Sequence, residues 1–436
     1  MLNIDGTILN NEITPDILKS SAGADISFPA CVHKIRGASG FSFVMVRTGR
    51  YLIQTVHDAK RCEKGLDELT EGMYIDLCGT VKEEPRAELG AEIVLKDFTV
   101  ISRPMASMPL RVSDNALGCG IEASMEHRTA ALRHPRERAV FRISEGVINA
   151  FRELMQKNAF TEIHTPRITA YPAEGVKGAF PIKYFGNDAF LSQSPQLYKQ
   201  TCIAVFDRIF EIAQAFRSEK HNSSRHLNEF ISLDLETGYI KGISDIMSTQ
   251  TAVINYIIAY LNEHYGYELG LLGTSLPEQK SIPSITFYEA LDILKKPHDQ
   301  ADLDPTDEVK ISEYAKKEYG SEFLFVTHFP AVKRPFYIAD SGEDPVLTES
   351  FDLIFRGMEI ASGGQRIHDY TKQLSKLERS GIDPKELEWF LSSLKYGMPP
   401  HGGSGMGLER FVMKLLGLEN IRQASLFPRD MHHFVP

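Results

Sequence analysis

The spacing of apolar residues changes near Arg138, and this change constrains the fold more than any other feature of the sequence. Before Arg138, short apolar runs are separated by glycine and charged residues. After it, Val140, Ile143, Val147 and Phe151 recur at helical spacing. A chain of 436 residues with two such patterns is expected to contain more than one domain.

The N-terminal pattern, over residues 1–103, is typical of short strands joined by turns. Five such strands at this spacing predict a small β-barrel or sandwich. We also expect a helical stretch over Asp58–Leu69. The five expected strands are Ile26–Val32, Phe41–Val46, Tyr51–Val56, Met73–Val81 and Glu92–Ile101.

Residues 104–137 are interpreted as a hinge or linker, because they begin with Pro, Ser and Asn without periodicity and continue into a cluster of basic residues. Residues 138–436 are expected to form a larger α+β domain that opens with a long amphipathic helix. Its strand-like pieces are Ile203–Ala213, Phe230–Tyr239 and Leu353–Ile360, and its further helices are Ser244–Glu263, Lys372–Ser380 and Pro384–Tyr396.

Composition excludes several classes of protein. Hydrophobic residues make up 42% and charged residues 24%, which is globular usage and not that of a disordered or coiled-coil chain. The net charge of −10 argues against nucleic-acid binding driven by bulk charge alone. No apolar run is long enough for a membrane span, and the N-terminus does not resemble a secretion signal. Five scattered cysteines without a CxxC motif indicate a reducing, cytoplasmic environment.

The segment 210–239 is the most informative one for chemistry. It reads as a strand, a charged loop and a second strand, with Arg217 and Glu219 at the end of the first strand. Arg225, His226 and Phe230 lie at the far end of the loop. Arginine matches a phosphate group bidentately and an aromatic ring offers a stacking face to a base, so the hairpin suits a nucleotide. The competing interpretation is a surface hairpin with solvated charges.

A second segment, HGGSGMGLERFVMKLLGL, places four glycines before an amphipathic helix, with Arg410 in its first turn. Glycine permits close backbone approach and a helix N-terminus favours anions. Tight packing of a helix on a sheet explains such glycines equally well. The segment is neither a Walker loop nor a dinucleotide-binding fingerprint.

A third segment, SFDLIFRGMEIASGGQRIHDY, carries Asp352 and Glu359. Seven residues apart, they would lie on opposite faces of a regular strand, but a bulge near Gly357 would bring them to one face. Two carboxylates beside phosphates suggest Mg²⁺, held partly by the nucleotide. Either acid could instead be an exposed strand residue.

These three segments together resemble the class II aminoacyl-tRNA synthetases, and within them the aspartyl branch in its compact archaeal and eukaryotic form. FRSE…RHLNEF resembles motif 2, GSGMGLER motif 3, and the helix with FTEIHTPRI motif 1; QSPQLYKQ and SGGQRIHDY are aspartyl-type signatures. The resemblance implies an α+β multidomain protein. Its parts would be an N-terminal OB-fold barrel and a catalytic domain with an antiparallel sheet flanked by helices, assembled as a homodimer.

The resemblance also implies a reaction and roles for individual residues. Aspartate and ATP would give aspartyl-adenylate, and the aspartyl group would then be transferred to the 3′ end of a tRNA. Arg217 would be catalytic, holding both the α-phosphate and the substrate carboxylate. Residues implied in ATP binding are Arg217, Glu219, Arg225, His226, Phe230, Glu359 and Arg410, and those implied in Mg²⁺ binding are Asp352 and Glu359.

Substrate choice is expected to follow the charge of the amino-acid side chain. Lys199 and Arg366 are the expected cationic partners of the aspartate carboxylate, and an asparagine would leave them without a counter-charge. Lys199 could instead be a solvated helix lysine. The remaining residues implied in aspartate binding are Glu174, Gln196, Asp234 and Ser362.

The N-terminal barrel resembles the anticodon-binding domain of the same branch. Phe43 aligns with an anticodon-stacking residue, and Gln54 and Glu92 align with base-reading residues, although Phe43 could simply belong to the barrel core. His33 and Pro85 resemble the non-discriminating type, which charges tRNA-Asn as well as tRNA-Asp.

Three other functions remain open at the level of the sequence. An asparaginyl enzyme shares the fold, and the pair Lys199 and Arg366 argues against it. A paralogue without tRNA-charging activity would be expected to lose motif residues that are present here. A simple OB-fold nucleic-acid binder would leave residues 138–436 unexplained.

Overall fold

The computed structural model describes residues 13–37, 41–218, 220, 223–278 and 280–435. The chain divides into two compact units, residues 1–135 and 136–436. Each is described by itself.

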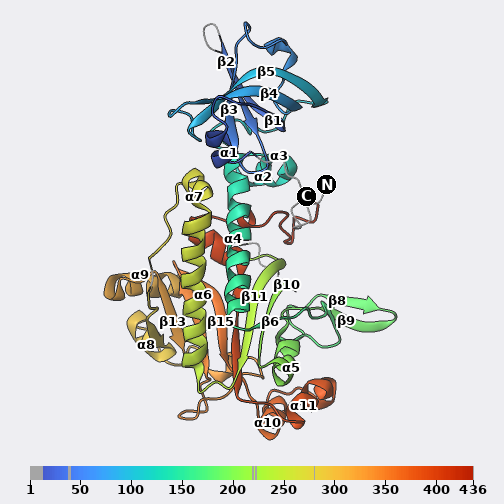
Figure 1. The fold of residues 1–436 in the computed structure, drawn as a ribbon. Helices are drawn as coiled ribbons and strands as arrows, with labels where there is room; N and C mark the ends of the chain where they lie inside the picture. Colours follow the sequence, from blue (N-terminus) through green and yellow to red (C-terminus); the bar gives the residue numbers. More distant parts are fainter. Residues whose placement is uncertain (1–12, 38–40, 219, 221–222, 279, 436) are drawn as a thin grey trace. The chain divides into compact units, whose positions relative to one another are not determined.

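The first unit contains a closed barrel of five strands in the order β1-β2-β3-β5-β4 (Figure 1). The short helix α1 (Pro15–Ser20) precedes the barrel. The expectation of a five-stranded barrel is confirmed. The strands are β1 (Asp25–Gly37), β2 (Ser42–Arg47), β3 (Leu52–His57), β4 (Tyr74–Glu83) and β5 (Ala91–Ser102).

The helix expected over Asp58–Leu69 is wrong, because only a single 3₁₀ turn, Leu66–Glu68, forms there. The Asp58 carboxylate accepts from the Lys60 backbone N–H at 2.9 Å and folds the chain into a turn. The segment 104–135 contains two short helices, α2 (Ile121–Glu126) and α3 (Arg128–Ala131), beside a small apolar cluster.

An eight-stranded, mainly antiparallel sheet forms the second unit, in the order β12-β13-β14-β15-β16-β11-β10-β6. Its bounds are β6 (Thr161–Glu162), β10 (Arg208–Phe216), β11 (Glu229–Gly238), β12 (Ser284–Thr286), β13 (Phe323–Thr327), β14 (Ser350–Phe355), β15 (Met358–Gln365) and β16 (His401–Gly407).

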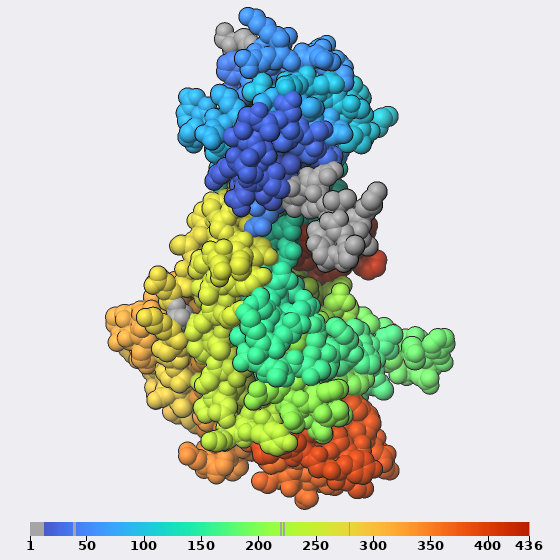
Figure 2. Space-filling view, viewed as in Figure 1, coloured from blue at the N-terminus to red at the C-terminus, as the bar shows by residue number. Residues whose placement is uncertain are grey.

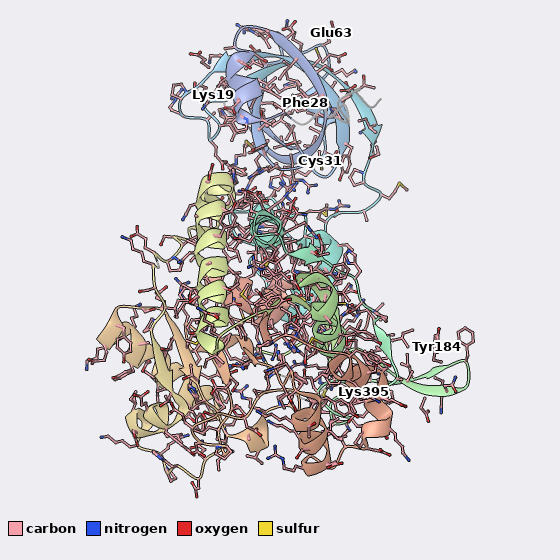
Figure 3. The ribbon with its side chains drawn as sticks, turned by 60° about the horizontal axis from the view of Figure 1, so that its bottom comes forward. Lys19, Phe28, Cys31, Glu63, Tyr184 and Lys395 are labelled. Atoms are coloured by element: carbon pink, nitrogen blue, oxygen red, sulfur yellow. The ribbon has the colours of Figure 1, made fainter. Side chains whose placement is uncertain are left out.

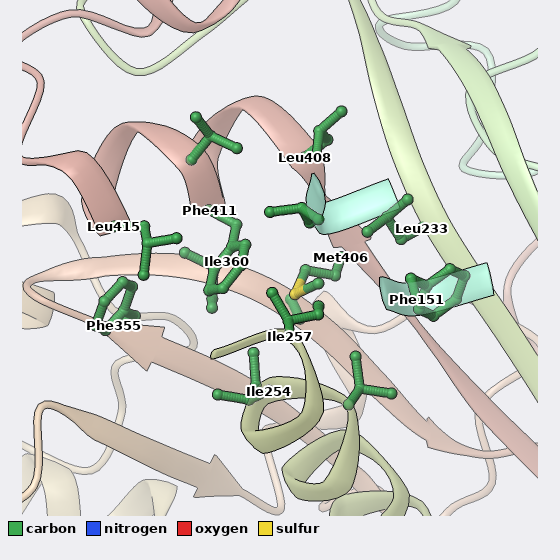
Figure 4. Close-up of a cluster of buried hydrophobic side chains, with 14 of the residues drawn as sticks. Phe151, Leu233, Ile254, Ile257, Phe355, Ile360, Met406, Leu408, Phe411 and Leu415 are labelled. Carbon is green, nitrogen blue, oxygen red and sulfur yellow. The ribbon is translucent and has the colours of Figure 1, made fainter. Parts of the chain in front are cut away.

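Three helices form one apolar core with this sheet (Figure 4). They are α4 (Pro135–Lys157), α6 (Ile243–His264) and α12 (Leu408–Leu416). The helices α4 and α6 approach closely at Gly146, where an added Cβ would lie 2.6 Å from the Leu261 side chain. None of the described helices is both long and apolar enough to cross a membrane.

The remaining elements surround the sheet. A three-stranded sheet in the order β7-β9-β8 ends in a hairpin that projects from this unit, with Tyr184 at its tip (Figures 2 and 3). The elements are α5 (Gln196–Phe206), α7 (Gly266–Leu272), α8 (Phe287–Leu294), α9 (Pro305–Tyr319), α10 (Tyr370–Arg379), α11 (Glu388–Lys395), β7 (Ile168–Thr169), β8 (Pro181–Tyr184) and β9 (Asn187–Leu191).

Two strand predictions in this unit are partly wrong. Residues 203–206 end helix α5, and the strand begins at Arg208. The piece Leu353–Ile360 is not one strand but a hairpin between β14 and β15. Its two turn residues, Arg356 and Gly357, both have positive φ, as a tight hairpin with the twist of the strands requires.

Candidate active site

A single cavity in the second unit brings together most of the residues singled out from the sequence. It lies over β11, β15 and β16, between α5 and the end of the β10–β11 hairpin. The predicted residues that line it are Glu174, Gln196, Lys199, Arg217, Arg225, His226, Phe230, Asp234, Glu359, Ser362, Arg366 and Arg410. Glu219 lies outside the described residues.

One end of the cavity, which we call the buried end, consists of Lys199, Asp234, Glu236 and Arg366. The Lys199 ammonium lies 2.8 Å from the Asp234 carboxylate and 3.4 Å from that of Glu236. The Arg366 guanidinium donates to Glu236 at 2.9 Å through Nε. None of the four residues is more than 3% exposed, so Lys199 is not a solvated lysine.

The glycines of β16 create the space for this network. Gly403 and Gly405 lie opposite Glu236 and Asp234 on β11. A Cβ added at Gly403 would lie 2.3 Å from the Glu236 carboxylate, so no larger residue fits there. The glycine-rich stretch is therefore a central strand, and its glycines accommodate buried carboxylates.

The buried end is electrically balanced, with two cations and two carboxylates. Burial acts to raise the pKa of Glu236, but Arg366 and Lys199 outweigh it and hold that pKa below its usual range. The expectation of two uncompensated cations therefore needs correction. Selectivity for an anionic ligand must come from where the remaining donors point, not from a net positive charge.

Several polar groups at this end have capacity for a ligand. Gln196 accepts from Arg366 at 3.3 Å through Oε1, whereas its Nε2 makes no hydrogen bond within the described part of the chain. Asp234 accepts from Lys199 through Oδ1, and its Oδ2 is likewise unsatisfied there. Buried polar atoms without partners are costly, so these two point to a polar ligand. An amide donor suits a carboxylate and the free carboxylate oxygen suits an ammonium group.

Glu174 reaches the same region from the loop before β8. Its carboxylate accepts from the Tyr337 hydroxyl at 2.7 Å and from the Ser194 hydroxyl at 3.2 Å. Burial, with Glu174 beside it, raises the pKa of Tyr337 well above its usual value, so the phenol stays protonated and donates to the carboxylate. The Arg366 guanidinium lies 5.5 Å from the centre of the Tyr337 ring.

Arg217 and Phe230 occupy the middle of the cavity. They lie at the loop end of the β10–β11 hairpin, Phe230 opposite Ala215 and Arg217 opposite Asn228, whose side chain donates to the Arg217 carbonyl at 2.6 Å. The Arg217 guanidinium lies 5.4 Å from the Phe230 ring centroid, and its Nε has no partner in the described structure. A cation with an unused donor beside an aromatic ring suits a phosphate attached to a base.

The other end of the cavity, which we call the open end, pairs three arginines with three acids. Arg225 forms an ion pair with Glu308. Arg410 donates to the Glu359 carboxylate at 3.3 Å, and Arg334 holds both oxygens of Asp352 at 3.0 and 2.7 Å. Asp352 thus lies beside the cavity in an ion pair that the sequence did not indicate.

The acids of the open end fit a magnesium ion only in combination with a ligand. Burial and the nearby Glu359 raise the pKa of Asp352, and Arg334 opposes both effects. A divalent cation would relieve the repulsion between these two oxygen donors. Among the described residues, no three acidic, histidine or cysteine side chains form a metal site by themselves. Phosphate oxygens of a ligand would have to complete the coordination.

The predicted residues of the barrel fall into three places. Phe43 lies on the outer face of β2, alternating with core residues, so it is not barrel core. On the neighbouring strands Gln54 donates to the Glu92 carboxylate at 2.9 Å. His33 is buried at a bulge in β1 and lines a different cavity, formed with residues 104–113. Pro85 stands in the turn between β4 and β5.

Sequence reasoning missed four residues of the catalytic cavity and its margins. Glu236 could have been found, because it lies two residues after Asp234 on one strand and so shares its face. Tyr337, Arg334 and Glu308 carry no local signal. They come from segments distant in sequence, and only the packing of the sheet brings them to the cavity.

Comparisons with known proteins agree with this geometry. The family model of the class II tRNA synthetases (D, K and N) matches residues 120–431. The chain is 37% identical over 440 residues to the aspartate–tRNA(Asp) ligase of Pyrococcus furiosus, and the match covers 99% of both chains. It is 37% identical over 429 residues to the aspartate–tRNA(Asp/Asn) ligase of Deinococcus radiodurans, covering 96% of this chain and 97% of that one.

A solved structure is also similar over the whole length. The asparaginyl-tRNA synthetase of Pyrococcus horikoshii, complexed with asparaginyl-adenylate, superposes with a TM-score of 0.89 at 28% identity. The alignment covers 98% of this chain and 100% of that chain.

Proposed function

The chain belongs to the class II tRNA synthetases (D, K and N), and from this premise we propose that it activates L-aspartate with ATP and transfers it to tRNA. The sequence-based assignment to this family is confirmed. The substrate tRNAs in this proposal are tRNA-Asp and tRNA-Asn, since the curated relatives include ligases of both the Asp and the Asp/Asn type.

One observation carries the proposal. A single cavity joins a buried end with paired cations and free amide and carboxylate atoms to an open end with three arginines. The first end suits an amino acid with an anionic side chain, and the second suits a triphosphate. Aspartate at the first end and ATP at the second would place the α-carboxylate of aspartate beside the α-phosphate, next to Arg217.

In the first step, an oxygen of the aspartate α-carboxylate bonds to the α-phosphorus of ATP, and the bond from that phosphorus to the pyrophosphate oxygen breaks. Negative charge develops on the α-phosphate oxygens, and Arg217 is placed to stabilise it. Lys199 and Arg366 would hold the side-chain carboxylate, while Asp234 and Glu174 would receive the α-ammonium group.

The open end would hold the rest of the nucleotide. Phe230 and Arg410 would enclose the adenine, and Arg225 with His226 would contact the outer phosphates. Bound Mg²⁺ would neutralise phosphate charge, with Asp352 and Glu359 as its protein ligands. Asp352 would then exchange its contact with Arg334 for one with the ion.

Amino-acid-dependent exchange between ATP and labelled pyrophosphate tests the first step. We expect exchange with aspartate and at least ~10³-fold weaker exchange with asparagine, because an amide would turn its own N–H donors toward donors such as Gln196 Nε2 that a carboxylate would satisfy. Comparable exchange with asparagine would instead support an asparaginyl enzyme, the candidate favoured by the structural likeness to the Pyrococcus horikoshii protein.

Charging of two purified tRNAs tests the second substrate. We expect labelled aspartate on both tRNA-Asp and tRNA-Asn. The resemblance to the non-discriminating type rests on His33, since strictly aspartate-specific enzymes of this family carry tryptophan at that position. His33→Trp should lower charging of tRNA-Asn and leave that of tRNA-Asp within about threefold. Negligible charging of tRNA-Asn by the unmodified protein would contradict the proposal.

A homodimer acting in the cytoplasm completes the proposed function. Phe206 and Tyr239 are 46% and 70% exposed. The residues next to them in the chain are joined by a backbone hydrogen bond, in which the Gly238 N–H donates to the Asp207 carbonyl at 2.7 Å. Such exposed apolar side chains suit an interface. Light scattering of the purified protein should give twice the 49.0 kDa chain mass.

A further inference from the structure

Glu308 belongs to none of the three motifs, yet its carboxylate contacts Arg225, which lines the open end of the cavity. It is in the first turn of α9, a helix that packs against the β14–β15 hairpin. Its Oε2 forms the ion pair with Arg225 and accepts the backbone N–H of Glu359 at 3.0 Å. One oxygen atom thus touches both the arginine expected at the outer phosphates and the strand that carries a magnesium ligand.

The contact with Glu359 is part of a wider junction between α9 and the hairpin. The Ser312 hydroxyl accepts from the Gly357 N–H at 3.0 Å. Val309 closes the same turn, since a Cβ at Gly357 would lie 3.0 Å from its side chain. The hairpin is therefore held in place by α9, and Glu308 is the member of this junction that also contacts Arg225 in the cavity lining.

Arg225 keeps binding capacity while it contacts Glu308. Only its Nη2 is used in the ion pair, and its Nε is buried without a partner in the described structure. The side chains of Arg225 and Glu308 are 16% and 11% exposed, so the pair is shielded from water. A shielded carboxylate that binds one edge of a guanidinium fixes the group, so that its remaining N–H donors stay oriented toward a ligand.

We propose that Glu308 is a positioning residue for ATP: it fixes the Arg225 guanidinium and the Glu359 backbone in the arrangement that receives the outer phosphates. This inference rests on the proposed function, because it takes the ligand of the open end to be Mg-ATP. Glu308 itself would touch neither the reacting phosphorus nor the amino acid.

Calorimetric titration of the full-length protein with Mg-ATP tests this inference. Glu308→Gln keeps the size and an acceptor but removes the charge that orients Arg225. We expect the Kd for Mg-ATP to rise about tenfold, the weight of one charge-assisted hydrogen bond. In exchange assays the KM for ATP should rise similarly, while the KM for aspartate stays within about twofold.

A matched control lies one residue away on the same helix. Asp307 is 1% exposed and forms an ion pair with the partly exposed Lys296 at 2.6 Å, outside the cavity. Asp307→Asn should lower the melting temperature without changing the Kd for Mg-ATP. A variant that merely loosens α9 would behave in this way, so the same result for Glu308→Gln would overturn the inference.

A double-mutant cycle separates action through Arg225 from a general effect of charge. In an Arg225→Gln background, Glu308→Gln should raise the Kd by less than about twofold, because the side chain that it positions is gone. A full tenfold effect in that background, or tighter binding in the single variant, would contradict positioning. If the unmodified protein does not bind Mg-ATP at all, the proposed function fails instead.

Discussion

At the buried end of the cavity, Lys199, Asp234, Glu236 and Arg366 hold one another between strands and a helix, and each is almost inaccessible to water. At the open end, the arginines are also paired with acids, but Arg410 and Glu359 remain 24% and 35% exposed as side chains. The buried pairs can keep their geometry when a ligand arrives. The open pairs must exchange partners, because phosphate competes for the arginines and a metal ion for the acids.

The two ends of the cavity should therefore bind their ligands in different ways. The buried end is preorganised, so its contribution should be a specific choice of amino acid. The open end is held ready by interactions that binding replaces, so each of its contacts should contribute less free energy. Substitutions at the two ends can therefore be ranked by expected effect.

The largest effect is expected from Lys199→Met. It removes a cation from a balanced buried network and leaves the carboxylates of Asp234 and Glu236 with one partner fewer. We expect kcat/KM for aspartate in pyrophosphate exchange to fall about 10³-fold or more. As a control, Lys296→Met removes a lysine that pairs with the buried Asp307 outside the cavity, and should lower stability without changing the KM for aspartate.

Acid should lower the folding stability through His401, the buried first residue of β16. Burial lowers the pKa of His401 to about 4 from 6.5. As pH falls from 6.5 toward 4, the unfolded state binds a proton that the folded state does not, so folding stability decreases. The loss is about 3 kcal/mol over this window, and urea unfolding from pH 7 to pH 4 measures it. His401→Gln should remove this part of the pH dependence; an unchanged slope would contradict it.

A smaller effect is expected at the open end from Arg410→Gln. The arginine donates to the Glu359 carbonyl at 3.1 Å and faces the proposed adenine site. We expect the KM for ATP to rise about 30-fold, with little change in the KM for aspartate. Arg356→Gln is the control for the KM for ATP, because Arg356 binds Glu322 and helix carbonyls outside the cavity. Equal losses from Arg410→Gln and Lys199→Met would break the contrast between the two ends.

The smallest effect is expected on the barrel. Phe43→Ala removes an exposed-face ring on β2, and stacking on one base is worth roughly 1–3 kcal/mol. We expect tRNA to bind about tenfold more weakly, measured by filter binding, with pyrophosphate exchange unchanged. Tyr74, an exposed aromatic residue at the start of β4, serves as the control: Tyr74→Ala should leave tRNA binding unaltered.

Local patterns sufficed for much of the fold. The barrel strands β2, β3 and β4 alternate core and surface residues, as in β2, where Ser42, Val44 and Val46 are buried. That alternation is visible in sequence because it follows from the geometry of each strand alone. The short-range pattern failed to locate the chain reversal at Arg356 and Gly357. Two residues with positive φ turn the chain there, and apolar residues continue on both sides, so the segment resembles one strand.

The amino-acid sequence by itself determined the family, the barrel strands and the set of charged side chains that gather in one cavity, because motif spacing and periodicity are local. Only the tertiary structure decided how those charges are matched. Glu236 balances Lys199 and Arg366, Arg334 holds Asp352, and Glu308 holds Arg225. Each of these pairs joins segments distant in sequence, and a charge pair depends on distance and burial, which no local pattern contains.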